Sequence, residues 1–509
     1  MPADDSPSSP APVPATPKTA GAELTVEQAF RLVFPGVMVA MFLAAADQTI
    51  LASALPVIAS SLHDVADLSW VVVGYLLAAT IAAPIYGHLG DTFGRKRLLL
   101  VALAIFTVAS LACALAPTLP LLIAARGLQG LGGGGLMTMA QSIIGENVSP
   151  RERGRFGGYF AAVFALSSTA GPVLGAYLTE HFTWRAVFFI NLPLGAIAAL
   201  LAVRIPHVRH PRTTPFRADV VGAALFAAAT LTLLFALSSA GHRFAWASPT
   251  LFGLLGAALL GYVLLITWER RRDDPVIPVR LLAVPAILRA DAVVFCFAAV
   301  LFSTILYLPL YLQLGRGMAI GESGLLLLPI TLSMVAAATF TGRRVARTGR
   351  TVEYPVRGLL LTTSALMALG FGLPHLPTLV VLALTVATGA GLGAVMPPTQ
   401  VIVQHAAGRS ALGSATASIA MARSIGGAVG VAIVGAVLFV VVGRDHGDTS
   451  TSLNAALEGG AAFIAKLAPA DQAALGARLD QAFRLVFAII AAMAAVGAAI
   501  AVTVPKPKL

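Results

Sequence analysis

Two ionisable side chains lie inside runs of residues that are otherwise apolar. Asp47 interrupts the segment "FLAAADQTILASALP" (residues 42–56), and Arg126 lies several residues inside a second apolar segment. A carboxyl group can bind and release a proton, and a nearby guanidinium, which stays charged, favours the ionised form of the acid. A charge at mid-bilayer costs between about 2.5 and more than 10 kcal/mol, so it normally faces water or a partner, or is neutralised. We therefore expect Asp47 and Arg126 to form a proton-coupling site.

Each residue also has a simpler interpretation. Asp47 could lie near the water boundary and bond to Gln48 or Thr49, and Arg126 could satisfy backbone carbonyls at a helix kink. Arg423 is a further cation in an apolar segment, and for it a structural role is as reasonable as a functional one.

The elements that hold these residues are membrane-spanning helices. Of the 509 residues, 58% are hydrophobic and only 11% are charged, and the mean hydropathy is +0.86. Apolar stretches long enough to cross a bilayer recur from residue 33 to residue 503, and we count about fourteen of them. They lack the strict alternation of a β-barrel. The expected fold class is an all-α integral membrane protein.

The distribution of basic residues predicts the orientation. The net charge is +11, but the Arg and Lys residues are concentrated in alternate connections, such as 95–97, 151–155, 204–217, 270–272 and 343–350. This asymmetry follows the positive-inside rule rather than the pattern of a nucleic-acid-binding protein. We expect a multi-pass protein of the inner (plasma) membrane with both termini in the cytoplasm and no nucleic-acid partner.

An internal repeat divides the chain. Gly87, Gly94 and Arg95 recur as Gly342, Gly349 and Arg350, each 255 positions later. Such duplications are typical of transporters whose halves move around a central site. The expected division is a disordered cytoplasmic tail (1–30), a first six-helix half (31–205), two inserted central helices with cytoplasmic linkers (206–285), a pseudo-symmetric second half that includes an outer loop at 443–481 (286–503), and a short cytoplasmic tail (504–509).

The sequence "GHLGDTFGRKR" (87–97) has the features of a conformational latch. Its glycines let neighbouring helices approach closely, and Asp91 can pair with an Arg or face a helix N-terminus. A plain basic loop is the simpler alternative. The second copy has Ala346 in place of Asp91, and it offers Arg343, Arg344 and Arg347 as candidate partners. The expected latch residues are Gly87, Gly90, Asp91, Gly94, Arg95 and Lys96.

These residues resemble the loop motif of the major facilitator superfamily, and other segments resemble its 14-span drug:proton antiporter branch. The similar segments are "DQTILASALP" (47–56), "RGLQGLGGGG" (126–135), "GPVLGAYL" (171–178), "TWRAVFFINLPLG" (183–195), "RADVVGAALF" (217–226) and "DDPVIPVRLL" (273–282). The resemblance implies multidrug efflux driven by protons, with antibiotic resistance as its consequence. It associates Arg126 with proton coupling and Gly171, Pro172 and Gly175 with the antiporter helix motif.

The remaining candidates are polar and aromatic residues that could line a broad, mostly apolar cavity. They are Tyr75, Gln129, Gln141, Asn191, Tyr307, Tyr311, Gln313 and Gln400. The His residues show no metal-ligand spacing, and HExxH, GxxxxGKS and GxSxG patterns are missing from the sequence, so we expect no enzyme activity, no cofactor and no bound metal. Cys113 and Cys296 are expected to be packing residues.

The function expected from these features is proton-coupled antiport of lipophilic or cationic drugs or toxic compounds by alternating access. The partners would be a small-molecule substrate, protons and membrane lipid, and a monomer is favoured. A dedicated exporter of one metabolite, such as a self-made antibiotic, is the main alternative. A non-transporting receptor or scaffold fits less well, because intramembrane charges are expensive to retain.

Overall fold

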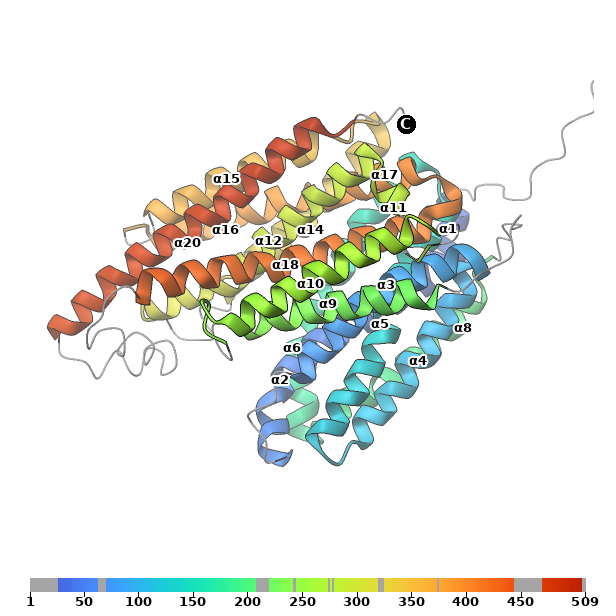
Figure 1. Ribbon diagram of the computed structural model, residues 1–509, viewed down its shortest axis with the longest axis horizontal. Coiled ribbons are helices and arrows are strands. Elements are labelled where there is room, and N and C mark those ends of the chain that lie inside the picture. The colour runs from blue at the N-terminus through green and yellow to red at the C-terminus, as the bar shows by residue number, and fades with distance from the viewer. Residues whose placement is uncertain are drawn as a thin grey trace, which may run out of the picture.

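The computed structural model describes residues 26–62, 70–206, 219–240, 244–272, 275–276, 279–318, 325–372, 375–443 and 469–505. Within these ranges the regular structure is helical, and the extended residues form a single isolated bridge between Ala240 and Phe244. Figure 1 shows long helices running roughly side by side.

The helices fall into three consecutive groups. The first group is α1 (Val26–Leu32), α2 (Phe34–Leu62), α3 (Trp70–Phe93), α4 (Arg95–Leu115), α5 (Leu119–Asn147), α6 (Pro150–His181), α7 (Ala186–Phe189) and α8 (Asn191–Val203). The inserted group is α9 (Val220–Ser239), α10 (Pro249–Glu269) and α11 (Val279–Leu282). The last group is α12 (Pro285–Leu314), α14 (Leu328–Thr348), α15 (Glu353–Gly372), α16 (Thr378–Gly393), α17 (Met396–Ala407), α18 (Leu412–Gly443) and α20 (Pro469–Thr503), with a 3-10 turn at Arg409–Ala411.

The predicted class of fold is confirmed, whereas the count of fourteen spans stays a prediction. Eleven segments of the described helices are long and apolar enough to cross a membrane. Helices α5, α6 and α14 have 29, 32 and 21 residues and so also have membrane length, but they fall outside this apolar set.

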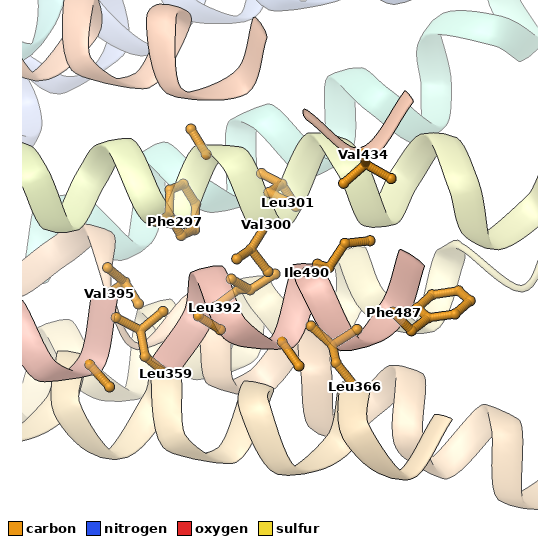
Figure 2. Packing of buried hydrophobic residues seen from close by; sticks show 14 of the residues in the cluster. Phe297, Val300, Leu301, Leu359, Leu366, Leu392, Val395, Val434, Phe487 and Ile490 are labelled. Carbon is orange, nitrogen blue, oxygen red and sulfur yellow. The ribbon is translucent and has the colours of Figure 1, made fainter. Parts of the chain in front are cut away.

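Each half has its own apolar core. In the first half, side chains such as Phe106, Leu136 and Phe156 are fully buried. In the second half one larger cluster joins α12, α15, α16, α18 and α20. Figure 2 shows this cluster, in which Leu301 of α12 and Ile490 of α20 lie between the layers of helices. The halves also pack against each other, since α14 contacts α6 and α18 contacts α3.

The inserted hairpin lies across the junction of the halves. Helix α9 packs against both α3 and α18, and in Figure 1 α9 and α10 run beside these helices. Trp70 of α3 stacks on Phe235 of α9 with 5.5 Å between ring centroids. At the other end of the hairpin, Asp219 accepts hydrogen bonds from Gly222 N and Trp268 Nε1, both at 2.9 Å, and thereby ties the start of α9 to the end of α10.

The predicted division differs from the structure at two points. Residues 26–30, expected in the disordered tail, belong to α1, because Phe30 packs against Phe34, Phe156 and Tyr159. The expected outer loop at 443–481 ends earlier, since α20 begins at Pro469 and extends well beyond the apolar stretch. Residues 1–25, 444–468 and 506–509 lie outside the described part.

Candidate functional site

Asp47 lies in the middle of α2, and its carboxylate is held by three side chains. It is only 2% exposed. Its Oδ2 lies 2.5 Å from Nη1 of Arg126, and its Oδ1 accepts hydrogen bonds from Gln129 Nε2 and Asn191 Nδ2, both at 2.8 Å. Helices α2, α5 and α8 therefore meet at this carboxylate, and the acid is fully paired in this conformation.

Arg126 is as completely surrounded as its partner. Its Nε donates to the backbone carbonyl of Val71 at 3.1 Å, and Nη1 also donates to Gln129 Oε1 at 2.7 Å. The guanidinium carbon lies 4.4 Å from the centroid of the Tyr75 ring, a cation–π distance. Arg126 thus satisfies a carbonyl, as its simpler interpretation proposes, while it pairs with Asp47.

Ser110 of α4 completes the network, and it was missed in the sequence. Its Oγ accepts hydrogen bonds from Gln129 Nε2 at 2.6 Å and from Asn191 Nδ2 at 2.9 Å. It is fully buried and so fixes both amides toward Asp47. A single serine in an apolar helix is an ordinary packing residue, so the sequence carries no signal that could have selected it.

Thr49 does not bind the carboxylate; it joins α2 to α6. Its Oγ1 donates to the carbonyl of Ser167 at 2.8 Å. A β-carbon on Gly171 would collide with this same hydroxyl. The antiporter helix motif therefore packs Gly171 next to the segment that carries Asp47, and α6 continues as a helix through Pro172 and Gly175.

A second polar cluster joins the halves at the end of the bundle that carries the basic loops. Asp91, near the end of α3, accepts hydrogen bonds from Gly413 N at 2.8 Å and Ser414 N at 2.9 Å. It also accepts from Ser414 Oγ at 3.1 Å and pairs with Arg95 at 2.6 Å. Asp91 thus both faces a helix N-terminus, that of α18, and pairs with an Arg.

The neighbouring residues of the predicted latch each have a structural reason. Arg95 is 2% exposed and lies 2.7 Å from Glu146 of α5. Lys96 donates to the carbonyl of Val203 at the end of α8 at 2.6 Å. A β-carbon on Gly87 would lie 2.7 Å from the carbonyl oxygen of Gly413, and one on Gly90 would overlap Met139.

Gly94 is required by its backbone. It has φ 96° at the turn between α3 and α4, a conformation that side chains disfavour. Its counterpart Gly349 also has positive φ, 68°, so the repeat preserves this turn. The three arginines proposed as partners of Asp91, namely Arg343, Arg344 and Arg347, are exposed, and the described contacts of Asp91 do not include them.

The eight candidate cavity residues are not brought into one cavity. Gln129, Asn191 and Tyr75 belong to the Asp47 network. Gln400 Nε2 donates to Gln141 Oε1 at 3.3 Å, and this contact joins α17 to α5 of the other half.

The other three candidates lie in the second half. Tyr307 donates to the carbonyl of Val431 at 3.2 Å, and Tyr311 donates to Asp480 of α20 at 2.9 Å. Gln313 is near the end of α12. These tyrosines hold helices of the second half together.

The fold and the site define a class of protein. Two packed helical halves meet at a polar contact on one end of the bundle, and one half carries a buried ion pair at mid-membrane depth. Residues 37–431 match the sequence profile of the Major Facilitator Superfamily, and the chain belongs to this family. The relatives that it matches are named as transporters.

The relatives agree with this assignment. The chain is 34% identical to the multidrug transporter protein MdtP of Bacillus subtilis over 412 residues, which cover 80% of this chain and 75% of MdtP. It is 33% identical over 422 residues to an uncharacterized MFS-type transporter of Mycobacterium tuberculosis, covering 83% of this chain but only 61% of that relative. The solved structure of the proton:xylose symporter XylE shares the fold, with a TM-score of 0.63 and 13% identity over 95% of this chain and 97% of XylE.

Proposed function

We propose that this transporter exports lipophilic or cationic compounds across the cytoplasmic membrane in exchange for protons, by alternating access. The observation that carries the proposal is the buried Asp47–Arg126 pair. The relative MdtP, whose name describes a multidrug transporter, supports the breadth of transport.

Protonation of Asp47 would change the balance of the network. The neutral carboxyl loses its ionic attraction to Arg126, while Gln129 and Asn191 lose a charged acceptor. Hydrogen bonds to an ionised acceptor are roughly twice as strong as neutral ones. Uptake of one proton therefore loosens the contact between α2, α5 and α8, and its release restores the contact.

Helix α5 offers a route from this site to the latch. Arg126 and Glu146 lie on the same helix, about 30 Å apart along its axis. Glu146 pairs with Arg95, which in turn pairs with Asp91 of α3. Asp91 accepts hydrogen bonds from the first turn of α18. A shift of α5 at the ion pair would therefore reach the contact that holds the halves together. Closing and opening of this latch would expose the substrate site to alternate sides.

The experiment uses everted membrane vesicles acidified inside and a pH-sensitive dye, with a panel of lipophilic cations, neutral drugs and antibiotics. Wild type should show dye recovery when a substrate is added, since export is coupled to proton movement. Asp47→Asn should reduce this recovery at least about tenfold, because an amide cannot bind and release the coupled proton. Glu353→Gln, a half-exposed carboxyl at the start of α15 that lies near Arg350 and Arg357, is the matched control and should behave as wild type.

Unimpaired proton-coupled export by Asp47→Asn would overturn the assignment of the coupling site. Recovery with a single compound from a wide panel would favour a dedicated exporter of one metabolite over a multidrug transporter.

A further inference from the structure

Arg423 of α18 has a different environment from the other intramembrane arginine. Arg126 has an acid, an amide, a carbonyl and an aromatic ring around it. Arg423 is partly buried, and among the described residues it has neither an ion pair nor a hydrogen bond nor a ring contact. A guanidinium keeps its charge and five donors under all relevant conditions. An unpartnered guanidinium at this depth is costly to retain. A ligand that binds to it and is released during transport would explain why the residue is charged.

Arg423 lies on a face of α18 that begins at the contact between the halves. Leu412, Thr416, Arg423 and Gly427 are spaced by four, seven and four residues and therefore share one face of α18. On this face the carbonyl of Leu412 accepts from Ser142 of α5 in the other half, at 3.5 Å. Thr416 accepts from Gln404 of α17 at 3.2 Å. The start of this face thus contacts α17 and the first half, and one turn beyond Arg423 the same face contacts α12.

The depth of Arg423 is close to that of Asp47. It lies about 16 Å along α18 from Leu412, and Asp47 lies about 20 Å along α2 from Phe34. One turn beyond Arg423, Gly427 lies against the ring of Phe302 on α12, which is 42% exposed. A cation and an aromatic side chain therefore lie within about one helical turn of each other along α18, past the polar contacts that close one end of the bundle.

The acids of the described spans do not neutralise Arg423. Asp47 is occupied by Arg126, Gln129 and Asn191. Asp291 lies only about 9 Å along α12 from Pro285, nearer the latch end, and it is not paired with Arg423. A compound with a positive charge would meet an uncompensated positive charge at Arg423, whereas a carboxylate can bind a guanidinium through two parallel hydrogen bonds.

We propose that Arg423 is the docking residue for an anionic group of the transported compound, so that the preferred substrates are lipophilic organic anions, carboxylates above all. The apolar part of the compound lies against the aromatic surface at Phe302. This inference rests on the proposed export function and narrows it, because it selects acids rather than cations from the range of lipophilic compounds.

The test uses three probes that differ only in charge: a dansyl group on an eight-carbon chain that ends in a carboxylate, its methyl ester, or an ammonium group. Binding to the purified full-length protein in nanodiscs is followed by dansyl fluorescence, and export is followed separately in everted vesicles. Wild type should bind the carboxylate at least about tenfold more tightly than the ester or the ammonium probe.

Arg423→Gln should remove this preference and leave binding of the ester within about twofold, so the ester reports that the variant is folded. Arg423→Lys should retain part of the preference, because the charge stays and the paired geometry is lost. Arg357→Gln, an exposed arginine of α15, and Asp291→Asn should both keep the wild-type ratio. If Asp291→Asn changed the ratio as Arg423→Gln does, an internal Asp291–Arg423 pair would replace the proposal.

An unchanged carboxylate-to-ester ratio in Arg423→Gln would overturn the proposal, as would stronger binding of the ammonium probe by wild type. If replacing chloride with gluconate weakened all three probes equally, and Arg423→Gln removed that effect, the bound anion would be inorganic and the substrate assignment would be wrong. Binding that depends on Arg423 without any export in vesicles would support this inference and contradict the export function. Export of the ester or ammonium probe with binding that does not depend on Arg423 would support the export function and contradict this inference.

Discussion

The two halves of this transporter share a repeat but differ in how they treat charge. In the first half, mid-membrane charges are paired in a network around Asp47. The repeat places Phe302 at the position of Asp47 and, in the register of the glycine-rich segments at 130–141 and 389–400, Thr385 at the position of Arg126. Duplication therefore preserved the helices and their close contacts, while the paired mid-membrane charges lie in the first half and the second half carries Arg423, which has no partner among the described residues.

The glycine contacts between halves show what was preserved. Gly87 of α3 lies against Gly413 of α18. The repeat counterpart of Gly413 is Gly158 of α6, which lies against Thr339 of α14, one turn before Gly342. Both contacts bring helix backbones from different halves close together. They differ in their polar part, because only the first has a carboxylate, that of Asp91. The repeat thus supplies close helix contacts on both sides of the junction, and the proposed latch lies on one of them.

The largest effect should come from breaking the charge network of the first half. Arg126→Gln leaves the carboxylate of Asp47 buried without its cation, and removal of one partner of a buried pair costs about 3 to 5 kcal/mol. We expect loss of coupled export and a large drop in thermal stability. Stability can be followed by the reaction of a thiol dye with the buried cysteines Cys113 and Cys296.

The double variant Asp47→Asn with Arg126→Gln provides the control. It removes both charges, so it should unfold at a higher temperature than Arg126→Gln while still lacking transport. Strictly additive losses of stability in the double variant would show that the two residues do not act as a pair.

The second effect concerns the close contact of the latch. A β-carbon on Gly413 would collide with the carbonyl of Gly87, so Gly413→Val should hold α3 and α18 apart. We expect export to fall at least about tenfold, because the closed state loses its packing. Spin labels on exposed Phe93 and Thr348, at the ends of α3 and α14, should report a longer distance. Gly476→Val in α20, where a β-carbon would meet open space, is the matched control, and an equal effect there would refute the contact model.

The third effect is the loss of the latch charge. Asp91→Asn keeps a side chain of similar shape but weakens the cap on α18 and the pair with Arg95. Caps and charges at helix N-termini are each worth about 0.5 to 2 kcal/mol, so the ratio of closed to open latch should fall by roughly tenfold. The same spin labels should show a larger open population, and export should slow but persist. An unchanged distance distribution would show that Asp91 does not control the equilibrium.

The charged residues and the latch glycines could be predicted from the sequence, whereas the polar side chains that connect them could not. A carboxylate and an arginine in apolar segments are conspicuous because of their cost, and the glycines of the latch stand in a fixed spacing. Ser110 and the mutual orientation of Gln129 and Asn191 depend on the packing of α4, α5 and α8, which the sequence does not specify. The sequence does not identify the partners of Asp91 for a similar reason. They are mainly backbone N–H groups at the start of α18, and every helix start has such groups whatever its sequence.

The smallest effect should come from copying the carboxylate into the second half. Ala346→Asp places an acid where the repeat aligns it with Asp91, so symmetry alone would predict a second latch. The two targets differ, however. Helix α18 begins at Leu412, so Gly413 and Ser414 have free N–H groups in its first turn, whereas α6 begins at Pro150, and Gly158 and Tyr159 are already within the helix. The backbone N–H groups at these positions are already used within the helix. We expect export and the spin-label distances to stay within about twofold of wild type, since a half-buried acid beside exposed arginines adds at most about 1 kcal/mol. A clear shift toward the closed state would mean that the charge of the acid, rather than the free start of the opposing helix, makes the latch.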